Sequence, residues 1–133
     1  MNELKSFIQE QIENLREIIF LYKMKFRLKM EMKMADMKHY ISNKRYFVIP
    51  DLRSVTGMTN CCADQFKTMR KRGQIKESDR FLEIERKAFY MTPLQRTGEG
   101  MPTMEQRIEM SKNFNNYLKK ANRIPAIMKG GKR

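Results

Sequence analysis

The chain has 133 residues, which is enough for one modest domain with an appendage but not for two full domains. Its formal net charge of +13 at pH 7 indicates a polyanionic partner, and nucleic acid is the first candidate. The sequence contains no apolar run of membrane-spanning length and no signal-peptide core, so we expect no membrane partner and a cytoplasmic location, meaning the host cytoplasm or the virion if the protein is viral.

The charge is unevenly distributed along the chain. Residues 1–21 carry a net charge of −2 and residues 50–92 carry +3, whereas residues 22–49 and 93–133 each carry +6. Much of any affinity for phosphate is therefore expected to come from the segments that flank the middle of the chain. The alternative is that these basic faces are merely solvated, or that they bind RNA or an acidic protein.

An amphipathic helix is predicted for the N-terminal arm, residues 1–43. Apolar residues recur from Leu4 to Phe26 at steps of four and three, which places them on one face of a helix. This face is wider than an isolated helix would leave exposed, so it either packs within the subunit or forms a seam between copies. The residues expected at an oligomer interface in this arm are Ile8, Ile12, Leu15 and Ile19.

Residues 22–34 alternate apolar and charged side chains without a break, which is the period of a β-strand. However, Met, Lys, Leu, Glu and Arg favour helices, and the segment contains no β-branched residue. We therefore favour a continuing helix over a strand. The methionines around it are expected to pack rather than to bind a metal, and His39 is expected at the surface or in a hydrogen bond.

A short helix is predicted to begin near Asp51, which can act as its N-cap after Pro50. Gly57 would then permit a left-handed turn. The residues of this helix that are spaced to face a core are Leu52, Val55 and Met58.

A second helix is predicted after the turn, capped by Thr59 or Asn60 and ended by Gly73. The basic run 70–72 falls in its last turn, where cations complement the helix dipole. Its expected core-facing residues are Cys62, Phe66 and Met69, while Cys61 is expected at the surface. Adjacent cysteines make a poor structural disulfide, and this fits a reducing compartment.

A hairpin is predicted beyond Gly73, because Ile75 and residues 81–91 are rich in β-formers and are interrupted at Arg86 and Lys87. The stretch TGMTNCCADQFKTMRKRGQI would then supply a turn, a recognition helix and a glycine exit, followed by a wing. Residues 47–93 in this arrangement resemble the winged helix-turn-helix family, including its excisionase-like and MerR-like branches. The expected fold is mainly α with a small β-hairpin wing, and a winged helix-turn-helix core is flanked by long helical arms at both ends.

The resemblance implies that the second helix enters the major groove and that the wing touches the backbone or the minor groove. Asn60 would be suited to adenine, and Lys67 to guanine or phosphate. The base-contacting positions expected on this basis are Thr59, Asn60, Cys61, Ala63 and Lys67. The expected phosphate-contacting positions are Arg70, Lys71, Arg72, Arg86 and Lys87, together with Lys23, Lys25, Arg27 and Lys29 of the N-terminal arm.

The chain is accordingly divided into a helical arm (1–43), a winged-helix-like domain (44–93), a linker (94–103), a C-terminal helix (104–122) and a basic tail (123–133). Thr103 and Gln106 form a capping-box signature at the start of the C-terminal helix. That helix is expected to end before Pro125, and the tail is expected to be a mobile arm that contacts phosphate. The apolar face of this helix comprises Met110, Phe114, Tyr117, Leu118 and Ala121, of which Phe114 and Leu118 are expected at the oligomer interface.

We expect no enzyme, no cofactor and no metal, because the sequence has a single histidine and no phosphate-cradling glycine loop or paired metal-binding cysteines. The first hypothesis is a sequence-specific regulator of transcription or recombination in a virus or mobile element, which binds duplex DNA as a homo-oligomer. The second is an architectural or virion component of a large assembly that binds nucleic acid or neighbouring subunits without reading sequence. The third is an RNA-binding subunit of a ribonucleoprotein.

Overall fold

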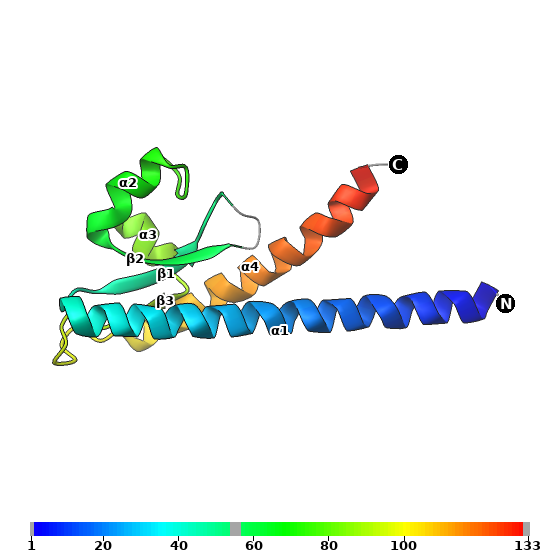
Figure 1. Cartoon of the computed structure of the whole chain (residues 1–133), viewed down its shortest axis with the longest axis horizontal. Helices are drawn as coiled ribbons and strands as arrows, with labels where there is room; N and C mark the ends of the chain where they lie inside the picture. The colour runs from blue at the N-terminus through cyan, green and yellow to red at the C-terminus, as the bar shows by residue number, and fades with distance from the viewer. Residues whose placement is uncertain (1, 54–56, 132–133) are drawn as a thin grey trace.

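Two long helices and a small antiparallel sheet form the protein (Figure 1). This computed structural model describes the backbone of residues 2–53 and 57–131, and side chains up to residue 121. The predicted class, mainly α with a small β element and a long helical arm at each end, is confirmed. The elements are α1 (Asn2–Ser42), β1 (Tyr46–Pro50), β2 (Met58–Cys62), the 3₁₀ helix η1 (Ala63–Gln65), α2 (Phe66–Lys71), α3 (Phe81–Lys87), β3 (Tyr90–Met91) and α4 (Met104–Gly131).

Helix α1 is continuous over 41 residues, so the helix favoured for residues 22–34 is confirmed and the strand alternative is wrong. The alternating pattern divides the apolar residues between two sides of the helix. Met24 and Ala35 are buried against the rest of the chain, whereas Phe26 and Met30 remain 64% and 44% exposed on the outside. Intrinsic helix propensity therefore outweighs the two-residue period in this segment.

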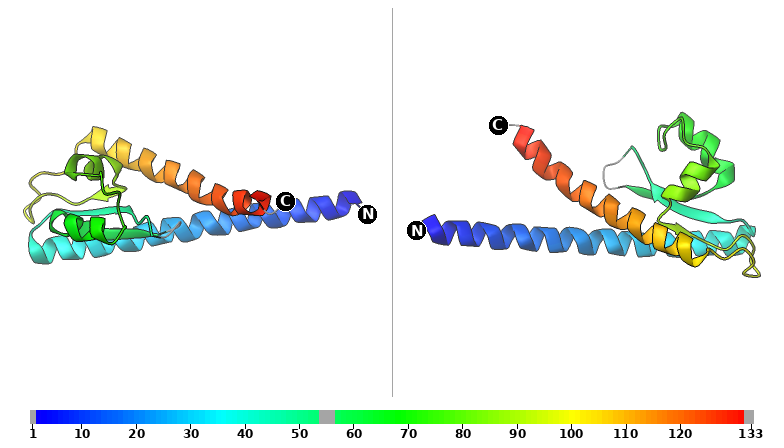
Figure 2. Two further views of the ribbon diagram at one scale, coloured as in Figure 1. Left: turned by 90° about the horizontal axis from the view of Figure 1, so that it is seen from above. Right: turned by 180° about the vertical axis from the view of Figure 1, so that it is seen from behind.

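The sheet has the order β2-β1-β3, with β1 in the centre. Val48 pairs with Asn60 on one side and with Tyr90 on the other. Helices α2 and α3 cover one face of the sheet, and α1 and α4 cover the other face (Figures 1 and 2). The protein is therefore a three-layer sandwich in which the sheet is the middle layer.

Alternating side chains of β1 enter two separate cores. Phe47 and Ile49 pack towards α2 and α3, and Phe47 lies 5.7 Å from Phe66 between ring centroids. Val48 points to the opposite face. There it packs with residues of α1 and α4, including Met24, Ala35, Phe114 and Leu118.

The predicted helix-turn-helix elements are wrong in their local structure. Where a first helix was expected, residues 51–53 leave β1 and the chain returns as β2 at Met58; Val55 lies outside the described residues. The expected hairpin is also wrong, because residues 81–87 form helix α3 and only Tyr90 and Met91 form a strand. Strands β1 and β2 provide backbone hydrogen bonds for each other. For residues 58–62, this gain from non-local pairing outweighs the local helix signal.

The C-terminal helix begins as predicted. The amide of Thr103 donates to Gln106 Oε1 at 2.9 Å, and the amide of Gln106 donates to Thr103 Oγ1 at 3.1 Å, so the capping box is confirmed. Its apolar face packs on the sheet, with Phe114 and Leu118 only 8% and 6% exposed. These two residues therefore belong to the subunit core and are not available at the predicted oligomer interface.

Helix α4 extends to Gly131, so the predicted end before Pro125 is wrong. The mobility of residues 123–133 and their contact with phosphate stay predictions. A proline removes one backbone donor, and a helix can continue past it when the flanking residues are helical. The side chains of residues 122–131, and residues 132–133 altogether, lie outside the described part. Within the described residues, neither arm nor any shorter helix is long and apolar enough to cross a membrane.

Candidate nucleic-acid interface

A polar groove of about 420 Å³ follows the free edge of strand β2. It reaches from the end of α1, through Lys38, to the outer face of α2. Strand β2 contributes its middle residues, and η1 and α2 form the opposite wall. The lining residues are Lys38, Thr59, Asn60, Cys61, Asp64, Gln65, Thr68, Met69, Arg72 and Gln74.

Helix α2 presents basic side chains beside this groove because its apolar residues are anchored beneath it. Phe66 and Met69 are buried in the core between the sheet and α2. Lys67 and Lys71, and Arg72 at the C-cap of α2, lie off this buried face and are exposed. The sequence pattern of α2 thus places three cations on the outer side of a short helix and its cap.

Gly73 ends this helix as predicted. Its φ of 77° lies in the left-handed region, and its amide donates to Arg70 O at 3.2 Å. The amide of Gln74 donates to Met69 O at 3.0 Å, which completes a glycine C-cap of the Schellman type. This cap keeps Arg72, the last cation, next to the groove.

The cations of α2 are not neutralised by carboxylates. Among the described residues, Lys67, Lys71 and Arg72 make no ion pair. The nearby carboxylate of Asp64 is instead paired with Lys44, and this hydrogen bond, with the charge of Asp64, raises the pKa of Lys44. Because Lys44 offsets the charge of Asp64, this wall of the groove keeps an excess of positive charge.

Asn60 is held beneath the groove and does not present its amide to solvent. Its Oδ1 accepts a hydrogen bond of 2.6 Å from Lys38 Nζ, and its Nδ2 donates to Glu31. With both ends of the amide engaged and only 9% of the residue exposed, Asn60 cannot make the predicted bidentate contact with adenine. The structure therefore does not present the side-chain amide of Asn60 for the predicted base contact.

Cys61 is also buried, at 2% exposure, and its predicted surface position and base contact are wrong. Burial, with a smaller contribution from Cys62, raises the pKa of the Cys61 thiol to about 12. Cys62 is buried as predicted, although it faces the other side of the strand. The remaining predicted base-contacting positions, Thr59, Ala63 and Lys67, stay accessible.

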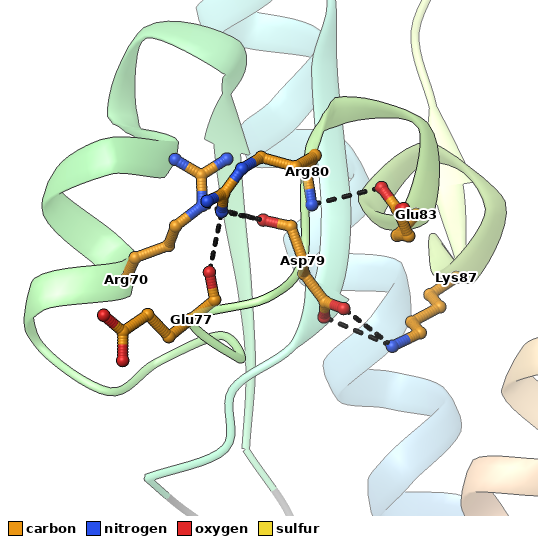
Figure 3. A network of polar contacts seen from close by, with 6 residues as sticks. All are labelled: Arg70, Glu77, Asp79, Arg80, Glu83 and Lys87. Atoms are coloured by element: carbon orange, nitrogen blue, oxygen red, sulfur yellow. Dashed lines mark hydrogen bonds and ion pairs between the residues drawn. The ribbon is translucent and has the colours of Figure 1, made fainter.

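Two of the predicted phosphate-contacting residues, Arg70 and Lys87, lie around Asp79 between α2 and α3 (Figure 3), and a third, Arg86, belongs to α3. Arg70 is half-buried, and its Nε donates to Asp79 O at 2.7 Å. Lys87 Nζ lies 3.1 Å and 3.2 Å from the two carboxylate oxygens of Asp79, which is buried. Arg86 is exposed. Arg70 and Lys87 are therefore engaged within the fold, and Arg86 alone of these three is a free surface cation among the described residues.

A second group of predicted phosphate contacts lies on α1, across the sheet from α2 (Figure 1). Lys23, Lys25, Arg27 and Lys29 are all exposed and make no ion pair with a described residue. The structure thus does not bring the predicted phosphate contacts together on one face. They form two separate basic surfaces on opposite outer layers.

Three polar residues that line the groove, Lys38, Gln65 and Gln74, were not identified from the sequence. Gln65 caps the free edge of β2, because its Oε1 accepts a hydrogen bond of 3.0 Å from the amide of Cys62. The spacing of three residues between Cys62 and Gln65 is the one local signal that could have indicated this cap. Lys38 and Gln74 reach the groove only through the tertiary fold. Comparison with known protein families, with curated proteins and with solved structures found no match to this chain.

Proposed function

We propose that this protein binds nucleic acid through its phosphate backbone, in an architectural role that does not depend on reading the base sequence. The observation that carries the proposal is the set of three exposed cations on α2, Lys67, Lys71 and Arg72, which have no carboxylate partner among the described residues. Cations held on a rigid element beside a polar groove are suited to successive phosphates.

The burial of the predicted base-reading residues favours phosphate contact over base readout. Asn60 is engaged by Lys38 and Glu31, and Cys61 is in the core. Helix α2 has only six residues, and most of its basic side chains, Arg70, Lys71 and the C-cap Arg72, lie at its C-terminal end. Recognition helices usually contact bases with their N-terminal residues, which here are preceded by η1 and strand β2.

The two basic surfaces support an architectural role. The cations of α1 and those of α2 lie in different outer layers, with the sheet between them (Figure 2). A single straight duplex cannot face both layers at once, so the protein would bridge two segments of nucleic acid or be wrapped by one. Non-specific contacts of this kind depend on charge rather than on sequence.

The proposal is tested by measuring affinity for fluorescent duplex DNA of random sequence over a range of salt concentrations. Three phosphate contacts by α2 alone predict a slope of log K against log salt of about −2.7, and contacts from α1 make it steeper. Selection from a random duplex library should retain DNA without enriching a motif. Enrichment of a motif would instead establish a sequence reader, and a flat salt dependence would overturn phosphate binding.

An RNA duplex and a single-stranded RNA are measured in the same experiment. Architectural binding to DNA predicts that the B-form duplex is bound at least as tightly as either RNA. A clear preference for RNA at equal salt would overturn the DNA assignment and favour a ribonucleoprotein subunit.

A further inference from the structure

Helix α1 carries a regular apolar seam that no other part of the described chain covers. The seam residues recur at steps of four, three, four, three and four, which is the spacing of the a and d positions of a coiled coil. Each of them is between 39% and 77% exposed. The α1 seam comprises Ile8, Ile12, Leu15, Ile19, Tyr22 and Phe26.

The α1 seam lies on the opposite side of the helix from the protein's own core. Met24 is buried against the body of the subunit, which is the sheet with the helices packed on it. Tyr22 and Phe26 lie two residues before and after Met24, so each is rotated from it by about 200° around the helix axis. Every described residue from 2 to 19 is exposed, and this half of α1 extends beyond the sheet (Figure 1). Neither the sheet nor the part of α4 whose side chains the structure describes can therefore cover the seam.

We infer that the α1 seam binds a second copy of the chain in an antiparallel coiled coil. The six seam residues, with Leu4 and Ile18 beside them, offer eight exposed apolar side chains. At roughly 100 Å² of apolar surface for each side chain, the contact would bury about 800 Å² per copy. That is about the area each partner contributes to a stable protein interface of standard size.

Charge favours the antiparallel arrangement over the parallel one. Residues 2–14 carry a net charge of −2, whereas residues 20–32 carry +3. Antiparallel pairing places the acidic part of each helix along the basic part of its partner, whereas parallel pairing places like charges together. It also puts the two bodies, each with a net charge of +15 over residues 22–133, at opposite ends of the pair.

Side-chain size also favours the antiparallel arrangement. When a positions of one helix meet d positions of the other, Phe26 faces Ile8 of the second copy, Tyr22 faces Ile12, and Leu15 faces Ile19. Each aromatic side chain then meets an aliphatic one, and all six positions are filled. A parallel pair in register would instead stack Phe26 on Phe26 and Tyr22 on Tyr22, leaving a seam of uneven width.

The sequence limits the coiled coil to this segment. The next two heptad positions after Phe26 are occupied by Lys29 and Lys33, which are exposed. Charged residues at these positions end an apolar seam. The seam therefore stops where the opposite face of α1 is already packed on the sheet, so the second copy approaches without contact with the body.

The inference does not rest on nucleic-acid binding, and it is tested on the protein alone by sedimentation velocity at micromolar concentrations. The wild-type chain should sediment as a dimer. Leu15→Lys should be monomeric, while Asn14→Lys, which adds the same charge off the seam, should remain dimeric. Circular dichroism should show cooperative melting of both variants, which separates loss of the dimer from loss of the fold, although Leu15→Lys also loses the stabilisation that the dimer provides. A monomeric wild type, or a dimeric Leu15→Lys variant, would overturn the inference.

The orientation is tested by thiol cross-linking with a short bis-maleimide. A chain with Ile12→Cys is mixed with a tagged chain carrying Tyr22→Cys, and the native cysteines are buried. Antiparallel pairing predicts a cross-link between the two different chains and none between identical chains. Cross-links between two Ile12→Cys chains would show parallel pairing and overturn the proposed orientation, and the wild-type chain serves as the reagent control.

Discussion

The ammonium group of Lys38 on α1 donates a hydrogen bond of 2.6 Å to the side-chain carbonyl of Asn60 on β2. Glu31, two helical turns earlier on α1, accepts a hydrogen bond from the side-chain nitrogen Nδ2 of Asn60. These two contacts fix the edge strand of the sheet to the long helix and form the base of the groove. Asn60 is thus a structural residue at a position where the sequence suggests a base contact.

Asn60→Ala is expected to reduce stability by about 1–3 kcal/mol, because it leaves the half-buried Glu31 and the ammonium group of Lys38 without their hydrogen bonds to Asn60. Urea denaturation measures this loss. Thr59→Ala, at the neighbouring and more exposed position, should cost less than about 0.5 kcal/mol. Equal losses for the two variants would show that the Lys38 and Glu31 contacts contribute nothing beyond those of an ordinary surface residue.

Replacement of Lys67, Lys71 and Arg72 together by alanine should weaken binding to duplex DNA. If each cation contacts one phosphate, the slope of log K against log salt should become shallower by about 2.7. Fluorescence anisotropy over a salt series provides the measurement.

The matched control for this variant replaces three exposed lysines of α4, Lys112, Lys119 and Lys120, by alanine. It removes the same total charge as the α2 variant. Its salt dependence should change less than that of the α2 variant. If both variants shift the slope equally, binding follows net charge and α2 is not a specific contact surface.

The buried Cys61 thiol should make the fold sensitive to alkaline pH. Burial raises its pKa from 9.0 to about 12, so above pH 9 the unfolded chain loses a proton that the folded chain retains. Stability is therefore fully present below pH 9 and falls as pH rises towards 12, by about 1.4 kcal/mol for each unit. Urea denaturation between pH 8 and pH 10 should show this loss in the wild-type chain, and Cys61→Ala should show a smaller one. An equal pH dependence in the two proteins would exclude Cys61 as its source.

The pair formed by Lys87 and Asp79 should contribute to stability at the junction of α2 and α3 (Figure 3). Lys87→Met leaves the buried Asp79 carboxylate without its ammonium partner and should cost about 1–3 kcal/mol. Arg86→Met, at the adjacent exposed position, is the control and should change stability by less than about 0.5 kcal/mol. Thermal melting distinguishes the two variants, and an unchanged midpoint for Lys87→Met would rule out a stabilising pair.

Local signals in the sequence were sufficient for the course of α1, the start of α4 and the end of α2, but not for the end of α4. The apolar steps of α1, the capping box of Thr103 and Gln106, and the glycine cap at Gly73 each depend on residues within a few positions of one another. Such short-range interactions are written directly in the sequence, so the two long helices and the small β content could be predicted.

The identity of the middle elements was decided by tertiary contacts. Residues 58–62 carry a helix-compatible pattern, yet they form a strand because β1 supplies hydrogen-bonding partners far along the chain. The same pairing turns Asn60 towards Lys38 and buries Cys61 on the other face. Residues 81–87 become a helix because Ile84 fills the core above β1 and the Glu83 carboxylate accepts from the Arg80 amide at 3.1 Å.

Composition and periodicity thus determined that the chain is basic and mainly helical, and that its N-terminal helix carries an apolar seam. Only the tertiary structure decided which cations remain free on α2, which are engaged, and which face of α1 is left uncovered. The physical reason is that helix formation depends on neighbours in sequence, whereas strand pairing, burial and charge pairing depend on residues brought together from distant positions.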